Sequence, residues 1–333
     1  MRELPPARAL RARVGALRQV CRIDRLAYED GAARGTRLVR VVTGGGLEFE
    51  LHPDRCLDIG HVTYDGTPMA WSAPAAPAGP AFAEHTGTGW QRTFAGGLLA
   101  TGGLDHFGSP SADQGVELGM HGRASALPAR DLNTRAAPDG DGALEVSAVM
   151  EQARLFGENL RLERRVTSRL GATGLAIEDT LTNQAPEPWP HMMLYHMNLG
   201  WPLVDDGTTV DIPATRVEAR DGAEPGGPAV GPPVPGAGER VLRHDLPPGG
   251  RTEITVANAG LGVACVIGVD TATLPYVFQW RMPASGVYAL GIEPADTPVM
   301  DGRAAARAAG ALGSLEPGES RVYRLDVRFR PYG

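Results

Sequence analysis

The last strand-like segment of the sequence carries the pattern that most restricts the fold. Between residues 321 and 330, Tyr323, Leu325, Val327 and Phe329 occupy every second position, and charged residues fill most positions between them. Side chains of a β-strand point alternately to the two faces of a sheet, whereas a helix repeats its apolar positions every three or four residues. The segment therefore predicts an antiparallel strand with one buried and one solvated face.

Similar segments recur through most of the chain. The predicted strands are 36–42, 47–52, 54–64, 144–155, 160–170, 175–183, 252–257, 261–269, 275–281 and 287–293. Gly44-Gly45-Gly46 separates the first two, as expected for a hairpin, and Arg164 places a charge on the inward register of its strand. Neither a strand–helix alternation nor a fixed-period repeat is present, which disfavours parallel α/β folds and propellers. The sequence predicts an all-β protein, a large antiparallel β-sandwich.

Helices and long loops are few in this prediction. Apolar residues at helical spacing in 5–19 predict a short N-terminal helix, so we expect an extension over 1–20 and a single sandwich domain over 21–333. Asp301 suits the cap of a short alanine-rich helix that ends at Gly310. The Gly- and Pro-rich residues 72–92 and 221–250 are expected to form loops, the first ordered and functional.

Composition and charge exclude several classes of protein. A net charge of −7 offers no basic surface for nucleic acid, and no apolar run reaches the length of a membrane span. The three cysteines, Cys21, Cys56 and Cys265, lack the spacing of a zinc site or a disulfide framework. We expect a cytoplasmic protein with reduced thiols. The sequence does not indicate whether it is a monomer or a homodimer.

The apolar segment 192–202 contains the first candidate site residues. In a strand, His196 and Asn198 share one face with Leu194, while Met193 and Tyr195 take the other face. An imidazole and an amide among apolar residues need polar partners, which a structural pair inside the core would also provide.

Two further segments carry polar residues beside glycine. His121 stands in Met-His-Gly-Arg, and Glu293 stands in Gly-Ile-Glu-Pro. A histidine and a carboxylate together can supply an acid and a base near neutral pH, although each residue alone is more often structural. His106 with His121 and His196 would permit a metal site, but the spacing typical of metal ligands is missing.

These three segments resemble the galactose mutarotase-like superfamily, which contains the aldose 1-epimerases. His121-Gly122, His196-Met197-Asn198-Leu199 and Gly291-Ile292-Glu293-Pro294 match the family's order and separation. Together with Asp54–Gly60 and Gly96–Leu104 they are similar to an uncharacterised branch, labelled as aldose 1-epimerase family proteins or as a domain of unknown function. The resemblance covers about residues 20–330 and is more specific for fold than for reaction.

The resemblance implies a mutarotase that interconverts sugar anomers through acid–base ring opening. Glu293 would be the base and His196 the acid, with His121 bonding the ring oxygen or a hydroxyl, and no metal or other cofactor is required. We expect the carbohydrate to be bound by further polar and aromatic side chains. The candidates are Arg55, Trp90, Gln91, His106, Arg123, Asn198, Gln279 and Trp280.

Two alternatives from other classes stay open. One is a lyase or isomerase, metal-assisted in one version, that moves a carbon-bound proton of an oxidised keto sugar with the same acid–base pair. The other is a non-catalytic carbohydrate-binding protein that keeps the cleft without the chemistry.

Overall fold

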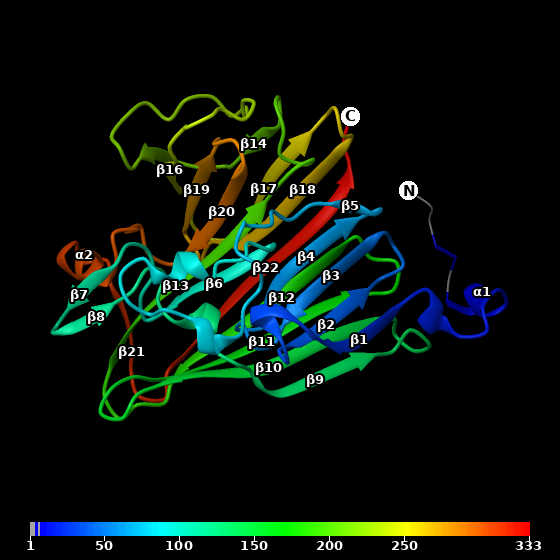
Figure 1. Ribbon diagram of the computed structural model, residues 1–333, viewed down its shortest axis with the longest axis horizontal. Helices are drawn as coiled ribbons and strands as arrows, with labels where there is room; N and C mark the ends of the chain where they lie inside the picture. Colours follow the sequence, from blue (N-terminus) through cyan, green and yellow to red (C-terminus); the bar gives the residue numbers. More distant parts are fainter. Residues whose placement is uncertain (1–3, 6) are drawn as a thin grey trace.

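Two antiparallel β-sheets and a few short helices make up the fold (Figure 1). The computed structural model describes residues 4, 5 and 7–333. The first sheet contains, in spatial order, β1 (Arg22–Ala27), β2 (Arg37–Val42), β3 (Leu47–His52), β4 (Asp58–Tyr64), β6 (Leu99–Leu104), β13 (Trp189–Leu199), β20 (Ala289–Ala295), β19 (Tyr276–Met282), β16 (Arg240–Asp245) and β15 (Arg216–Ala219). β5 (Thr67–Pro68) pairs with β4, and β21 (Gly313–Leu315) pairs with β13.

The second sheet faces the inner side of the first. In spatial order it contains β14 (Thr209–Asp211), β17 (Arg251–Asn258), β18 (Val263–Asp270), β22 (Ser320–Pro331), β12 (Gly174–Asn183), β11 (Asn159–Arg169), β10 (Ala143–Ala153) and β9 (Arg130–Ala136). A separate hairpin is formed by β7 (Ser111–Asp113) and β8 (Val116–Leu118). The sequence-based prediction of a large antiparallel sandwich is confirmed.

Short helices lie at both ends of the molecule. In Figure 1, α1 lies at one end, and α2 lies with the β7–β8 hairpin at the other. The helical segments are α1 (Ala7–Arg11), η1 (Leu17–Gln19), η2 (Gly31–Ala33), η3 (Pro80–Phe82), η4 (Gly89–Arg92), η5 (Ala124–Ala126) and α2 (Arg303–Ala308).

The main hydrophobic core fills the space between the two sheets. Met193, Tyr195 and Met197 of β13 point into it and meet residues such as Leu162 and Ile177 of the second sheet. The alternate β13 residues Met192 and Leu194 join a smaller cluster on the other face, beneath α2. The alternation predicted for this strand is therefore confirmed, and it turns His196 and Asn198 away from the main core.

The N-terminal helix is shorter than its prediction. α1 ends at Arg11, and Gly15, a residue that disfavours helix, precedes the separate turn η1. Buried Leu10 and Leu17 fix this region to the body. Residue 6 of the predicted helix 5–19 lies outside the described residues. The division into an extension over 1–20 and a domain over 21–333 stays a prediction.

Two local predictions are wrong. Asp301 does not cap α2, because Gly302 occupies the cap position with φ +88° and Asp301 instead pairs with Arg220. The loop expected over 221–250 contains β16, which lies between β15 and β19. Buried Leu242 and His244 alternate there with half-buried residues, and the Gly- and Pro-rich surroundings hide this short strand in the sequence.

No helix in the described part of the chain has the length and apolar character needed to cross a membrane.

Candidate active site

His196 and Glu293 come together because β13 and β20 are neighbours in the first sheet. The register pairs Met197 with Ile292 and Leu194 with Ala295, which places His196 opposite Glu293 on the face away from the main core. The His196 Nε2 atom lies 3.4 Å from Oε1 of Glu293, and the two residues are 6% and 2% exposed. This separation is slightly longer than an aligned hydrogen bond, as is common for catalytic pairs without substrate.

His121 is brought to the same place by its backbone. Its N–H donates to Gly108 O, and its carbonyl accepts a hydrogen bond from Gly103 of β6. The residue has φ +56°, and the following Gly122 has φ +74°. A Cβ atom on Gly122 would lie 2.3 Å from His106 O, so only glycine fits there. The His121 ring centre lies 5.5 Å from that of His196.

Aromatic rings enclose the His196 imidazole. The ring centres of Phe94, Trp280 and Trp90 lie 5.3, 5.7 and 5.9 Å from the imidazole centre. Trp90 also packs against His121 with a centre distance of 4.6 Å, and its Nε1–H donates to Ser125 Oγ. These rings supply an apolar surface of the kind that sugar-binding and other small-molecule sites use, and they remove water from the polar groups.

Burial controls the protonation of the three polar groups. Burial lowers the pKa of His196 to about 4, an effect that a hydrogen bond with Asn198 partly offsets. Burial, with smaller contributions from His196 and His106, holds the pKa of His121 well below its usual value. Burial also raises the pKa of Glu293 well above its usual value, and the negative charge of Glu239 adds to the rise. Both imidazoles are therefore neutral near pH 7, and Glu293 holds its proton more tightly than an exposed carboxyl group.

Glu239 connects a surface loop to this site. Its carboxylate accepts a hydrogen bond of 2.9 Å from Nε1 of Trp280, and its side chain is exposed. The Gly- and Pro-rich segment before β16 therefore ends at the rim of the site, next to the ring that packs on His196.

A buried ionic network lies beneath the site and joins the two sheets. Arg164 of β11 donates two hydrogen bonds to Asp179 of β12 and a third to Asp58 of β4. Tyr195 of β13 donates to Asp179, and Thr101 of β6 donates to Asp58. The charge at Arg164, which broke the inward pattern in the sequence, thus has two buried carboxylate partners and links the strands that carry the site.

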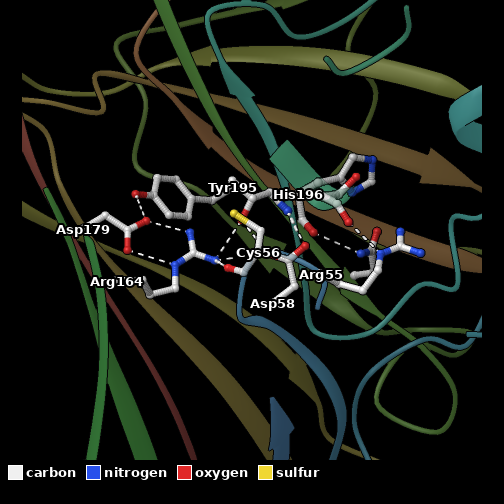
Figure 2. Close-up of polar contacts among 10 residues, drawn as sticks. Arg55, Cys56, Asp58, Arg164, Asp179, Tyr195 and His196 are labelled. Atoms are coloured by element: carbon white, nitrogen blue, oxygen red, sulfur yellow. Dashed lines mark hydrogen bonds and ion pairs between the residues drawn. The ribbon is translucent and has the colours of Figure 1, made fainter. Parts of the chain in front are cut away.

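Arg55 lies on the site side of this network. Figure 2 shows Arg55 and His196 at one end of the drawn cluster and Arg164 with Asp179 at the other, with Cys56 and Asp58 between them. Cys56 and Leu57 both have positive φ, 56° and 54°, which bends the chain sharply between Arg55 and β4. The guanidinium Nε donates to Ser125 O at 2.6 Å and Nη1 to Ala78 O at 3.2 Å.

Other predicted binding residues lie farther from His196 and Glu293. Gln91 and Arg123 are exposed. His106 is fully buried, and its Nδ1 accepts a hydrogen bond from the backbone N–H of Arg303 at the start of α2. Asn198 shares the face of His196 but donates to the carbonyl groups of Gly97 and His196, so its amide orders the strand ends.

Gln279 is placed on the opposite face of the sheet from His196 and Glu293. It pairs in register with the core residue Ile292, and its Oε1 lies 3.2 Å from Nε2 of His244. Since Gln279 and Trp280 are consecutive in a strand, only one of them can face the site, and Trp280 does.

The family comparison accounts for nearly the whole chain. The profile of a family described as a domain of unknown function (DUF4432) matches residues 33–329. The chain belongs to this family. The expected membership of a domain-of-unknown-function family is thereby confirmed. No curated protein matches the chain significantly.

Solved structures with the same fold come from several bacteria. A “putative aldose 1-epimerase” from Klebsiella pneumoniae superposes with a TM-score of 0.85 at 21% identity, over 92% of this chain and 83% of the other. A galactose mutarotase-like protein from Clostridium acetobutylicum gives 0.64 at 14% identity, over 94% and 99% of the two chains. Galactose 1-epimerase from Lactobacillus acidophilus gives 0.63 at 11% identity, over 94% and 100%. At these identities the comparisons establish the fold.

The sequence-based candidates omitted several residues around the site. Trp71 packs between Phe94 and Trp280, with ring centres 5.8 and 5.9 Å away, and neither Trp71 nor Phe94 was a candidate. The proximity of Phe94 to Trp90 in the sequence could have suggested it. Glu239 gave no signal, because its loop has no regular pattern.

The sequence left open a metal site formed by the histidines. Within residues 4, 5 and 7–333, no group of three or more His, Cys, Asp and Glu side chains is arranged to hold a metal ion. The alternative that combines His106, His121 and His196 in a metal site has no such group to support it.

Proposed function

We propose that this protein is a carbohydrate isomerase of the aldose 1-epimerase type, acting on a free sugar or a close derivative. The observation that most directly supports this proposal is the buried pair of His196 and Glu293, with 3.4 Å between Nε2 and Oε1. His121 and Trp280 pack against the His196 ring. The fold shared with proteins named as aldose 1-epimerases supports the same activity.

The proposed reaction transfers two protons and therefore needs one base and one acid. Glu293 as carboxylate removes the proton of the anomeric hydroxyl while protonated His196 gives a proton to the ring oxygen. The ring opens, the bond between C1 and C2 rotates, and the aldehyde closes on its other face with both proton transfers reversed. His121 holds the ring oxygen or a neighbouring hydroxyl by a hydrogen bond. Each positioned proton transfer contributes about 10²–10⁴-fold.

The protonation of the free pair fits this scheme with one additional step. Burial raises the pKa of Glu293 and lowers that of His196 to about 4, so a single proton held by the pair resides on Glu293 rather than on His196. Transfer of that proton to His196 across the 3.4 Å between Oε1 and Nε2 generates the carboxylate and the imidazolium. The hydroxyl groups of a bound sugar stabilise these charges, which burial otherwise disfavours.

Anomer exchange measured by NMR tests the proposal. Pure α-glucose, α-galactose and other aldoses are mixed with the protein, and the rate of approach to anomeric equilibrium is compared with that in buffer. Glu293→Gln should lower the enzymatic rate by about 10²-fold or more, because the base is lost. Glu187→Gln, at an exposed position whose side chain makes no hydrogen bond or ion pair with a described residue, is the matched control and should keep the full rate.

The same samples separate the alternatives. Rates equal to buffer across a broad panel of aldoses contradict the proposal. Deuterium from the solvent appearing at a sugar carbon identifies proton abstraction from a keto sugar instead. Sugar binding that Glu293→Gln leaves unchanged, without any exchange, identifies a carbohydrate-binding protein.

A further inference from the structure

A cavity of about 190 Å³ adjoins the candidate active site on the same face of the first sheet. Its walls come from β2, β3, β4, the segment before β6 and the loop over residues 72–78. An engineered cavity of about 150 Å³ holds benzene, so this one has room for a group of about one six-membered ring. The proposed anomeric chemistry at His196 and Glu293 makes no use of it.

The cavity begins where the catalytic face ends. Phe94 lines it and packs on His196, and Ala100 lines it while pairing in register with His196. Arg55 also lines it and donates to Ser125 O, and Ser125 Oγ accepts the hydrogen bond from Trp90, which packs on His121. The cavity and the His196–Glu293 pair therefore lie next to each other and share wall residues.

Two acidic residues of the cavity wall are already neutralised. Asp54 accepts hydrogen bonds from the guanidinium and the backbone N–H of Arg37. Asp58 accepts them from Thr101 and Arg164. Neither carboxylate is free to balance a charged ligand.

One cation and one anion remain in the cavity wall. Arg55 is bound only by carbonyl groups and makes no ion pair, and Glu50 makes neither a hydrogen bond nor an ion pair with any described residue. A guanidinium group only donates hydrogen bonds, and a carboxylate only accepts them. A hydroxyl group can do both, so it can accept from Arg55 and donate to Glu50. The opposite charges leave no net attraction for an anion or a cation.

The cavity also has a ring surface. Tyr28 and His52 both line it, and their rings are stacked, with centres 6.2 Å apart and planes 11° apart. Such a surface suits the apolar side of a sugar ring, while Arg55 and Glu50 suit its hydroxyl groups.

We infer that this cavity is a second sugar subsite, so that the substrate is a neutral, hydroxyl-rich saccharide of about two units. The reducing ring lies at His196 and Glu293, and the next unit lies between Arg55, Glu50 and Tyr28. The reducing-end part of this inference rests on the proposed function, whereas the cavity part concerns binding alone.

Binding measured by titration calorimetry tests the subsite without requiring turnover. The ligands are glucose and galactose, neutral reducing disaccharides with α- and β-linkages, and disaccharides whose non-reducing unit is a uronic acid. At least one neutral disaccharide should bind tenfold or more tightly than its reducing monosaccharide. Ala75→Phe, which fills the cavity from its loop wall, and Glu50→Gln should both remove that gain and leave monosaccharide binding unchanged. Glu48→Gln, on the same face of β3 but outside the cavity wall, should keep the gain.

The outcomes distinguish the two proposals. Equal affinity for mono- and disaccharides, or an equal loss of both in Ala75→Phe, overturns the subsite even if monosaccharides are interconverted. Tighter binding of the uronic-acid disaccharides overturns the neutral character of the ligand. A disaccharide that binds with the expected gain but shows no anomer exchange contradicts the proposed function and leaves the subsite standing.

Discussion

At the scale of single residues, the surroundings decide what a histidine does in this protein. His196 faces Glu293 and aromatic rings on the face of the sheet away from the main core. His191, in the same strand, points the other way, where its Nδ1 meets the buried Asp296 beside Tyr323. Both pairs combine an imidazole with a carboxylate, yet only the first lies beside a cavity and a second free imidazole. Residue type alone therefore does not identify the site.

The charge of Glu239 is expected to set the upper limit of the pH range for activity. Glu239 raises the pKa of Glu293, so Glu239→Gln should lower that pKa. The amide oxygen of glutamine can still accept the Trp280 hydrogen bond, so the ring keeps its place. The pair needs one proton, and the variant should lose activity at a lower pH on the alkaline side than the wild type.

Initial rates of anomer exchange across pH check this expectation. On the acidic side of the pH profile, His196 takes up a proton at about pH 4, and the pair then carries two protons. This side of the profile should stay nearly unchanged in the variant. Glu224→Gln, in the same loop but without a side-chain contact to the site, is the control. An unmoved alkaline limb in Glu239→Gln would show that the two carboxyl groups are not coupled.

The backbone at His121 should be unusually sensitive to a single methyl group. In Gly122→Ala the new Cβ would lie 2.3 Å from His106 O at φ +74°, so the backbone next to His121 must move. A displacement of about 1 Å can cost roughly 10²-fold in rate. Gly115→Ala has a similar φ of +79° but open space around the Cβ, so it should lose roughly 1–2 kcal/mol of stability and keep its activity. Rates of anomer exchange and denaturant midpoints of both variants test this expectation, and equal rates in the two variants would contradict it.

The sequence identified the cluster of His121, His196 and Glu293 better than the rest of the candidate site. His121, His196 and Glu293 could be found because their glycine neighbours and order match a known family, and the structure brings them together. Glu239 and Trp71 could not be found, because their proximity depends on loop paths that no periodicity records. Gln279 was misplaced because the face of a strand cannot be assigned without knowing its partner in the sheet.

At the scale of elements, the Arg164 network holds together the strands that carry the site. Asp58 begins β4, Thr101 lies in β6, and Tyr195 precedes His196 in β13, and all three are joined to Arg164 directly or through Asp179. The alternating pattern predicted β4, β11, β12 and β13 and the inward direction of Arg164, whereas the glycine-rich β6 was not among the predicted strands. The spatial order of the strands could not be predicted, because β6, β13 and β20 are distant in sequence and pair only through the closed fold.

Removal of the central cation should therefore destabilise the sandwich strongly. Arg164→Met leaves Asp179 and Asp58 buried without their partner, which typically costs about 3–5 kcal/mol. Addition of Asp179→Asn to this variant should recover part of the loss, because one uncompensated charge is removed. Arg165, the next residue in the strand, forms an ion pair with Glu145 at the surface and provides the control. Arg165→Met should change the free energy of unfolding by about 1 kcal/mol or less.

Urea unfolding of the three variants provides the measurement. A loss in Arg164→Met no larger than in Arg165→Met would mean that the network contributes nothing to stability beyond an ordinary surface pair.

At the scale of the whole molecule, the buried histidines make stability depend on pH. Burial lowers the pKa values of His52, His106, His196 and His244 to about 4, and that of His121 falls well below its usual value. In the unfolded chain these imidazoles bind protons near pH 6.5. Burial acts in the opposite direction on Glu293 and Asp58, whose raised pKa values make the folded state the one that binds protons.

Burial also lowers the pKa of the half-buried His85, so six imidazoles against two carboxyl groups leave more protons on the unfolded state between pH 6.5 and 4. The free energy of unfolding should therefore decrease as the pH falls through this range, by about 1.4 kcal/mol per pH unit for each net proton. Urea midpoints at several pH values between 7 and 4.5 give this slope. His244→Gln keeps a side-chain donor for Gln279 and removes one titrating group, so its slope should be smaller by about 1.4 kcal/mol per pH unit. A stability that does not change with pH would mean that these imidazoles are not held neutral by the fold.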